Sequence, residues 1–104
     1  MNYYPQTITT LRSKIRSTFP EAKAIEASPS MIDAWRPGLG HASDLPIMEN
    51  VLWMFDQMAG WTVGKSAKAG RWIGWINLVM GLSGLITHAE LRDMIRTDVQ
   101  AGDE

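Results

Sequence analysis

The chain has 104 residues, 45% of them hydrophobic, which suits one domain with its own core and leaves little room for a second. Its formal net charge of −1 argues against a general polyanion binder and against an acidic mimic of DNA. The absence of cysteine excludes disulfides, thiolate zinc sites and a cysteine nucleophile. We therefore expect a single domain over residues 1–104. The start Met1–Pro5 lacks the basic and apolar runs of a signal peptide, so we expect a cytoplasmic protein.

The first helix is predicted from about Thr7 to Thr18. Pro20 stops it, because proline lacks the N–H and restricts the residue before it. Its apolar residues recur at helical spacing: Ile8, Leu11, Ile15 and Phe19. Its outer face is basic, with Arg12, Lys14 and Arg16. Three charges are too few for a nucleic-acid footprint, so we interpret them as a solvated face.

The next stretch holds the first candidate binding residues. Glu21–Ala27 has little apolar content and is predicted to be one loose turn or a surface link. Ser28 and Pro29 favour the start of a short helix, with the serine as cap and the proline at the first helical position. Trp35 beside Arg36 predicts either a cation–π pair or an exposed anchor for a partner.

A third helix is predicted from Ser43 or Asp44 to about Trp61. It has a wide apolar face, made of Ile47, Met48, Val51, Leu52, Phe55, Met58 and Ala59. Trp53 falls on the other side, and is therefore the best candidate for an exposed aromatic residue.

The loop Gly60–Ser66 is similar to a phosphate-binding loop only in part. That pattern needs four residues between its glycines and a preceding strand, whereas here three residues follow a predicted helix. We interpret it as a helix-to-helix loop with a basic end at Lys65 and Lys68. His41 and His88 lack the spacing of a metal-binding pair, so no metal and no cofactor is predicted.

A fourth, apolar helix follows, because no residue between Arg71 and His88 carries a formal charge. Its apolar residues recur at steps of three and four: Trp72, Ile73, Trp75, Ile76, Val79 and Met80. The run of about sixteen residues is shorter than the ~20 that a membrane span needs. We therefore expect a buried core helix with Trp72 and Trp75 in its dry centre.

Four glycines are predicted to shape this helix. Gly70 and Gly74 share one side, which predicts close approach by another helix, whereas Gly81 and Gly84 are predicted to end it. Arg71, at the mouth of the helix, is predicted to pair with a carboxylate such as Asp44 or Glu49, or to stack on Trp75 or Trp61.

The last helix has the clearest local start signal. Thr87 is predicted to cap it, with Glu90 three residues later completing a capping box. The predicted inward stripe is Leu91, Met94, Ile95 and Val99. The residues predicted to face water are Arg92, Asp93, Arg96 and Asp98.

One segment resembles a known group of proteins through the pattern R-W-[LI]-G-[FW]-[VI] … G-[ILV]-x-T … E-x-R. The matching residues are Lys68–Ile76, Gly84, Ile86, Thr87 and Glu90–Arg92. Arg71, Trp72 and Gly74 carry this resemblance to small uncharacterised phage and prophage proteins, over about a quarter of the chain. It departs at Asn77-Leu78, where those proteins often have Gln-Gly. The resemblance implies a phage or prophage accessory protein of a bacterial cytoplasm, and it implies no reaction.

Together these elements predict an all-α fold, a compact single-domain bundle of four main helices plus a short fifth helix. The third and fourth helices are expected to form the core pair through the glycine face. No catalytic triad or paired carboxylates emerge, so we predict that the protein is not an enzyme.

The first functional hypothesis is a non-enzymatic phage accessory protein that binds a host protein or protein complex, for example an inhibitor of a host defence complex of the anti-CRISPR type. Its predicted partner-binding residues are Trp53, Trp35 and Arg36, because Trp and Arg dominate interface energies. A second hypothesis is a small nucleic-acid-binding protein. It would use Arg12, Lys14, Arg16, Lys23, Lys65 and Lys68. A third is a structural phage protein that forms homo-oligomers through its Trp and Met residues.

Overall fold

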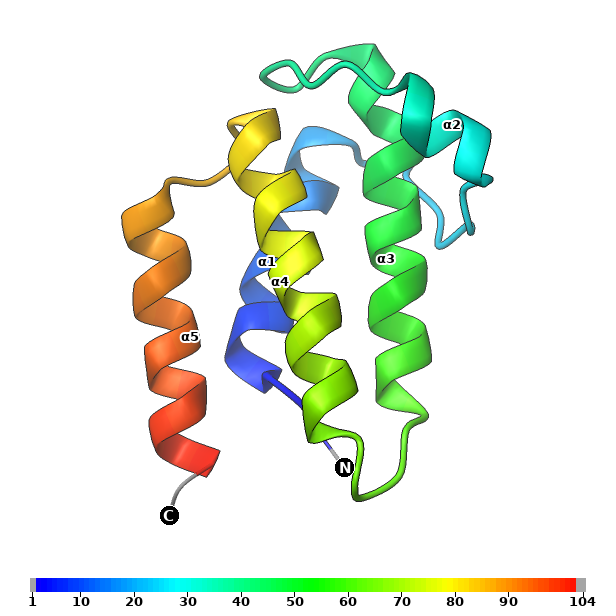
Figure 1. Cartoon of the computed structure of the whole chain (residues 1–104). Helices are drawn as coiled ribbons and strands as arrows, with labels where there is room; N and C mark the ends of the chain where they lie inside the picture. The colour runs from blue at the N-terminus through cyan, green and yellow to red at the C-terminus, as the bar shows by residue number, and fades with distance from the viewer. Residues whose placement is uncertain (1, 103–104) are drawn as a thin grey trace.

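Five α-helices and one 3-10 turn make up the fold of the computed structural model, which describes residues 2–102 (Figure 1). The elements are α1 (Pro5–Thr18), α2 (Pro29–Ala34), the 3-10 turn η1 (Ala42–Asp44), α3 (Leu45–Ala59), α4 (Ser66–Ser83) and α5 (His88–Gly102). No strand occurs in this part of the chain. The predicted all-α bundle of four long helices and one short helix is confirmed.

The four long helices enclose one hydrophobic core. In Figure 1, α4 lies at the front, with α5 on its left, α3 on its right and α1 behind it. Each helix contributes buried side chains. Among them are Leu11 and Ile15 of α1, Met48, Leu52 and Phe55 of α3, Ile73, Ile76 and Met80 of α4, and Leu91 and Met94 of α5. These positions recur at three and four residues, so the helical period did identify the core-facing stripes.

Local signals set several helix ends. Gly84 follows α4 with a left-handed φ of 77°, a conformation that glycine adopts without strain, and it ends the helix as predicted. Gly81, also predicted to end it, instead lies inside α4. The ring atom Cε1 of His88 would lie 3.2 Å from a Cβ at Gly81, so this glycine leaves space for the imidazole. Ser28 caps α2 through its hydroxyl, which accepts from Met31 N–H at 3.3 Å.

The expected glycine contact between α3 and α4 is wrong. A Cβ at Gly74 would meet nothing within 4 Å, and one at Gly70 would have Tyr4 Oη as its nearest neighbour, at 3.7 Å. The larger side chains Ile73, Ile76 and Met80 form the buried stripe of α4 instead.

Trp72 and Trp75 do not lie in a dry centre either. Both indoles are half-buried and pack against the edge of the core. A wide indole suits such a margin, because it covers apolar neighbours while one edge stays in water.

The N-terminus of α1 is closed by a residue of the last helix. Asp98, predicted to face water, accepts hydrogen bonds from Gln6 N–H (3.1 Å), Thr7 N–H (2.8 Å) and the Thr7 hydroxyl (2.6 Å). The α1 N-cap residue, Tyr4, makes no side-chain capping bond, so Asp98 takes over that role from across the bundle. A carboxylate also complements the positive end of the helix dipole.

Two further loops are fixed by long-range hydrogen bonds. Tyr3 Oη donates to the Thr62 carbonyl at 2.7 Å and accepts from Lys65 N–H at 2.9 Å, which ties the N-terminal arm to the α3–α4 loop. The stretch before α2 is a non-helical link, as predicted, and it lies on α3. There Glu49 Oε2 accepts from Lys23 N–H and Asn50 Oδ1 from Ala27 N–H, both at 2.9 Å.

Candidate functional site

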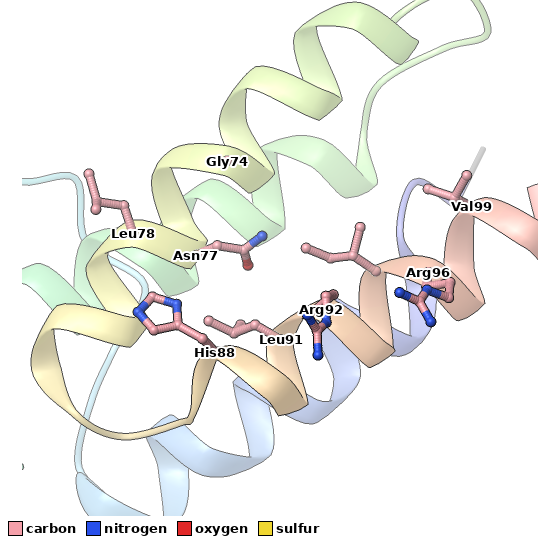
Figure 2. Close-up of a pocket in the computed structure, with 9 residues that line it drawn as sticks. Gly74, Asn77, Leu78, His88, Leu91, Arg92, Arg96 and Val99 are labelled. Atoms are coloured by element: carbon pink, nitrogen blue, oxygen red, sulfur yellow. The ribbon is translucent and has the colours of Figure 1, made fainter.

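A groove of about 620 Å³ lies between α4 and α5 (Figure 2). We call it the α4/α5 groove. Its lining residues are Gly74, Asn77 and Leu78 of α4, and His88, Leu91, Arg92, Ile95, Arg96 and Val99 of α5. The floor is mainly apolar, and its size is within the range of ligand sites in proteins.

The groove exists because α5 packs mainly on α1 and leaves part of α4 uncovered. Gly74 has no side chain to fill the space. Leu78 is 55% exposed and Val99 45% exposed, so each helix presents an apolar side chain to solvent at the groove. Val99 was predicted to point inward, and that prediction is wrong. Leu82, one turn beyond Leu78 on α4, is 54% exposed and extends the apolar edge.

One edge of the groove is basic. Figure 2 shows Arg92 and Arg96 one turn apart on α5, whereas Leu78 of α4 lies closer to His88. Both arginines are exposed, as predicted, and neither forms an ion pair with a carboxylate of residues 2–102. Their donors are therefore available to an acidic group that enters the groove.

Asn77 adds an unsatisfied polar atom to the groove. Its Oδ1 is buried, yet accepts no hydrogen bond within the described chain. Leaving a buried acceptor without a donor costs about 1–3 kcal/mol, a local destabilisation that Asn77 places beside the groove.

The three predicted partner-binding residues lie elsewhere. Trp53 is half-buried rather than exposed, and its ring stacks on Trp72 with centroids 6.1 Å apart. Trp35 is also half-buried, and its indole N–H donates to Asp44 Oδ1 at 2.9 Å. Arg36 is exposed and donates to the Trp35 carbonyl at 3.0 Å. No cation–π pair joins these two neighbours in the described structure.

Asp44 explains why Trp35 is held in place. This carboxylate is fully buried, and its Oδ1 also accepts from Gly38 N–H at 3.3 Å. The loop between α2 and α3 is thereby wrapped around one acidic side chain. Trp35 thus has a structural role in the chain itself, which sequence spacing did not reveal.

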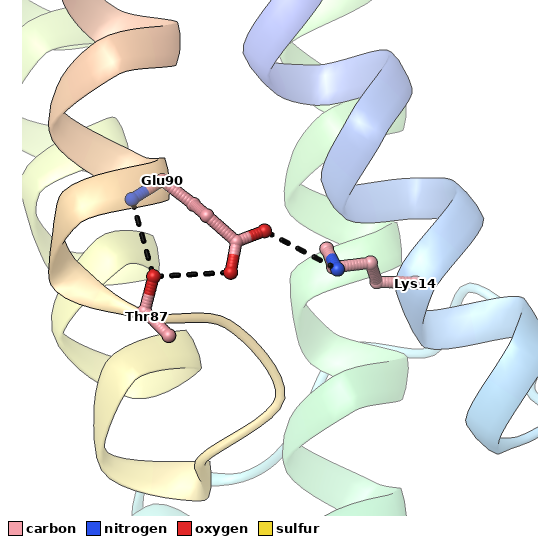
Figure 3. Close-up of polar contacts among 3 residues, drawn as sticks. All are labelled: Lys14, Thr87 and Glu90. Atoms are coloured by element: carbon pink, nitrogen blue, oxygen red, sulfur yellow. Dashed lines mark hydrogen bonds and ion pairs between the residues drawn. The ribbon is translucent and has the colours of Figure 1, made fainter.

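The basic side chains of α1 also form contacts within the molecule. Arg12 pairs with Asp56 at 3.5 Å and lies over the Phe55 ring, 5.7 Å from its centroid. Lys14 lies 3.6 Å from Glu90 (Figure 3), and Arg16 donates to the Ala22 carbonyl at 3.2 Å. These side chains keep much of their surface in solvent, as interpreted, with Arg12 38% and Lys14 36% exposed and Arg16 exposed. Their contacts also join α1 to α3, α5 and the following link.

The six cations of the nucleic-acid hypothesis do not gather on one surface. Lys14 lies beside Glu90 at the start of α5, which follows the end of α4, whereas Lys65 and Lys68 lie at the start of α4. Lys68 is directed at two indoles, 4.8 Å from the Trp61 centroid and 5.5 Å from that of Trp72. A continuous phosphate-binding track would need these charges side by side.

Arg71 pairs with neither of its predicted carboxylates. It is exposed, and no ion pair joins it to Asp44 or Glu49 within the described chain. The side chains of Asp44 and Glu49 instead bond to loop N–H groups and the Trp35 indole.

Among residues 2–102, no three His, Asp or Glu side chains come close enough to hold a metal ion. No helix of this region has the length and apolarity to cross a membrane. In comparisons with known proteins, the chain matches no protein-family model, no curated protein and no solved structure.

Sequence reasoning had placed no site in this groove. Arg92 and Arg96 had been predicted only to face water, and Gly74 to touch α3. The sequence signal for this groove is Gly74 itself, a glycine in mid-helix, whereas its lack of a packing neighbour is visible only in the structure.

Proposed function

We propose that this protein acts by binding another protein, without catalysis, and that the α4/α5 groove receives an amphipathic helix with acidic residues. We base this on the combination of an open apolar floor with a basic edge, Arg92 and Arg96, that no carboxylate of the described chain neutralises. Such grooves take the apolar face of a helix, while charges at the edge select the partner.

The dimensions of the groove favour a short helix. From His88 to Val99, α5 extends about 16 Å, or three turns. A partner helix of similar length would place apolar residues against Leu78, Ile95 and Val99. Its acidic residues would then meet Arg92 and Arg96 in charge-assisted hydrogen bonds.

The biological setting is also part of the proposal. A phage or prophage accessory protein that inhibits a host defence complex, for example of the anti-CRISPR type, would act through such a surface. Only the resemblance of the segment around Arg71, Trp72 and Gly74 supports this setting.

Site-specific crosslinking in bacterial cells tests the proposal. A photo-reactive phenylalanine analogue replaces Leu78 in the groove or, as the control, Gln57 on the exposed side of α3. We expect one discrete crosslinked species from position 78 and none from position 57. Equal crosslinking from both positions would show that the groove is not the binding surface.

Charge reversal tests the acidic character of the partner. The double variant Arg92→Glu and Arg96→Glu is expected to abolish the crosslink from position 78. Lys23→Glu with Lys65→Glu reverses as many charges away from the groove and is expected to retain it. A crosslink that survives reversal of both arginines would rule out an acidic helix as the partner.

A further inference from the structure

A second groove, of about 380 Å³, lies on the other side of α4, where α4, α3 and α2 meet. Three indoles line it, from Trp53 of α3 and from Trp72 and Trp75 of α4. Glu26 and Asp33, from the link before α2 and from α2 itself, line it as well. We call it the Trp groove. None of the residues lining the α4/α5 groove lines it.

Two of the indoles are fixed by mutual packing. The rings of Trp53 and Trp72 stack at 6.1 Å with 26° between their planes. Trp61 meets Trp72 edge-on, at 4.7 Å and 73°. Rings held in this way lose little conformational freedom when a ligand binds, so the site is preorganised.

The polar atoms of the Trp groove indicate the charge of its ligand. Asn50 is already bonded, since its Oδ1 accepts from Ala27 N–H at 2.9 Å and its Nδ2 contacts Met54 Sδ at 3.6 Å. Glu26 and Asp33 are exposed, and no cation of residues 2–102 pairs with either of them. The charge presented to a ligand is therefore negative, beside aromatic and aliphatic surfaces.

The indoles already attract a cation within the molecule. The ammonium of Lys68 lies 5.5 Å from the centroid of Trp72, within the distance at which the quadrupole of the ring attracts positive charge. Lys68 does not line the Trp groove, and it lies over Trp61 and Trp72, so no cation of residues 2–102 lies over the rings of Trp53 and Trp75.

We propose that the Trp groove binds an organic cation with apolar substituents, an alkylated ammonium or a guanidinium. The indoles contact its apolar groups and its charge through cation–π attraction, and Glu26 and Asp33 balance that charge. Such a group is present in small quaternary ammonium compounds and in the arginine or lysine side chains of a protein. The site is independent of the α4/α5 groove, whose basic edge would repel the same ligand.

Nuclear magnetic resonance of the indole N–H groups tests this with an internal control. The full-length protein, labelled with ¹⁵N, is titrated with choline and separately with 3,3-dimethylbutan-1-ol, its uncharged isostere, up to about 50 mM, which reveals millimolar Kd values. We expect choline to shift the signals of Trp53, Trp72 and Trp75. The signal of Trp35, whose N–H is bonded to Asp44, is expected to stay in place.

The charge dependence decides the outcome. Choline is expected to bind at least about threefold more tightly than its isostere, and the variant Glu26→Gln with Asp33→Asn to lose that preference. Asp93→Asn, which removes an exposed carboxylate of α5, is the matched control and is expected to keep the preference for choline. Equal shifts with choline and with its uncharged isostere would overturn the proposal.

A third titration identifies the source of the cation. N-acetylarginine methylamide carries a guanidinium as a protein side chain would. Tighter binding of this compound than of choline would identify a protein partner, and the reverse a free quaternary ammonium. If neither compound shifts the three indole signals, the Trp groove is not a cation site.

Discussion

Asp98 joins the two ends of the described chain through one carboxylate. It accepts three hydrogen bonds at the start of α1, from a position more than ninety residues later. We expect Asp98→Ala to lower the free energy of unfolding by about 2–3 kcal/mol, because two helix N–H groups and one hydroxyl lose a charged acceptor. Urea denaturation measures the difference.

Asp93→Ala is the control for the Asp98 prediction. It removes an exposed carboxylate from the same helix, one whose side chain makes no hydrogen bond or ion pair in the described structure. We expect a change within about 0.5 kcal/mol, as for most surface substitutions. Equal losses in the two variants would mean that the α1 contacts contribute nothing beyond general charge effects.

Gly74, unlike Asp98, makes no contact that explains why this residue type is needed for the fold. Glycine inside a helix costs about 0.5–1 kcal/mol relative to alanine, and a Cβ at this position would meet nothing within 4 Å. Gly74→Ala is therefore expected to raise the stability by that amount, as measured by thermal unfolding. The added methyl is also expected to weaken the crosslink from position 78, because it enters the α4/α5 groove.

Gly70→Ala separates these two effects. It makes the same change one turn earlier in α4, where the nearest atom, Tyr4 Oη, lies at an ordinary contact distance of 3.7 Å. Gly70 does not line the groove, so we expect a similar gain in stability and unchanged crosslinking. If both variants crosslink like the original chain, close approach at Gly74 is not needed for binding.

At the scale of the element, the start of α5 links helix capping to a second helix. Figure 3 shows the Thr87 hydroxyl donating to Glu90 Oε1 at 3.0 Å and accepting from Glu90 N–H at 3.2 Å. Lys14 of α1 lies 3.6 Å from the other carboxylate oxygen. The Thr87 hydrogen bond, and then the positive charge of Lys14, hold the pKa of Glu90 below its ordinary value of 4.5.

The lowered pKa of Glu90 predicts a pH dependence of stability. Because the folded pKa is below the unfolded one, the stabilisation is fully present above the unfolded pKa and is lost as the pH falls through the folded pKa. Between about pH 6 and about pH 3, the original chain is expected to lose more stability than Glu90→Gln, whose side chain stays neutral. Thermal unfolding followed by circular dichroism measures this, with the exposed Glu21→Gln as control. Parallel pH curves for all three chains would contradict it.

Local signals in the sequence predicted element ends well, because their physics is local. Ser28, Gly84 and Thr87 act on backbone groups within a few residues of themselves, and the structure confirms all three. The partner of each helix face was harder to predict. The helical period shows that α4 and α5 have apolar stripes, but it does not show that α5 would pack on α1 and leave Gly74 and Val99 uncovered.

Residue type alone does not specify the surroundings of a side chain, although Trp53 does line the Trp groove. Trp35 and Trp53 were chosen because tryptophan dominates interfaces, yet one is bonded to the buried Asp44 and the other is stacked on Trp72. The sequence pattern of Arg92 and Arg96 is that of solvated charges, and only the packing of α4 beside α5 places them at a groove. A site formed by two helices depends on their packing, which local patterns do not specify.

At the scale of the whole molecule, the formal net charge of −1 is the sum of a basic groove, an acidic groove and other charges elsewhere on the surface. On one side of α4 lies the α4/α5 groove with Arg92 and Arg96, and on the other lies the Trp groove with Glu26 and Asp33. The uncovered face of α4, with Leu78 and Leu82, lies between them. A partner that covers this whole face would need charges of both signs in the complementary order.

This arrangement predicts the oligomeric state. A two-fold dimer through the α4/α5 groove would bring the same surface of both copies together, so that Arg92 and Arg96 would face their own counterparts. A head-to-tail contact would place the α4/α5 groove of one copy against the Trp groove of another, so that charges of opposite sign would attract. Physiological salt screens these few exposed charges. We therefore expect a monomer at about 0.15 M salt, as measured by light scattering over a hundredfold range of concentration.

At low salt, any association is expected to be open-ended and to disappear in the double variant Arg92→Glu with Arg96→Glu. A discrete dimer that persists at high salt would instead identify a second copy of the chain as the occupant of the apolar groove.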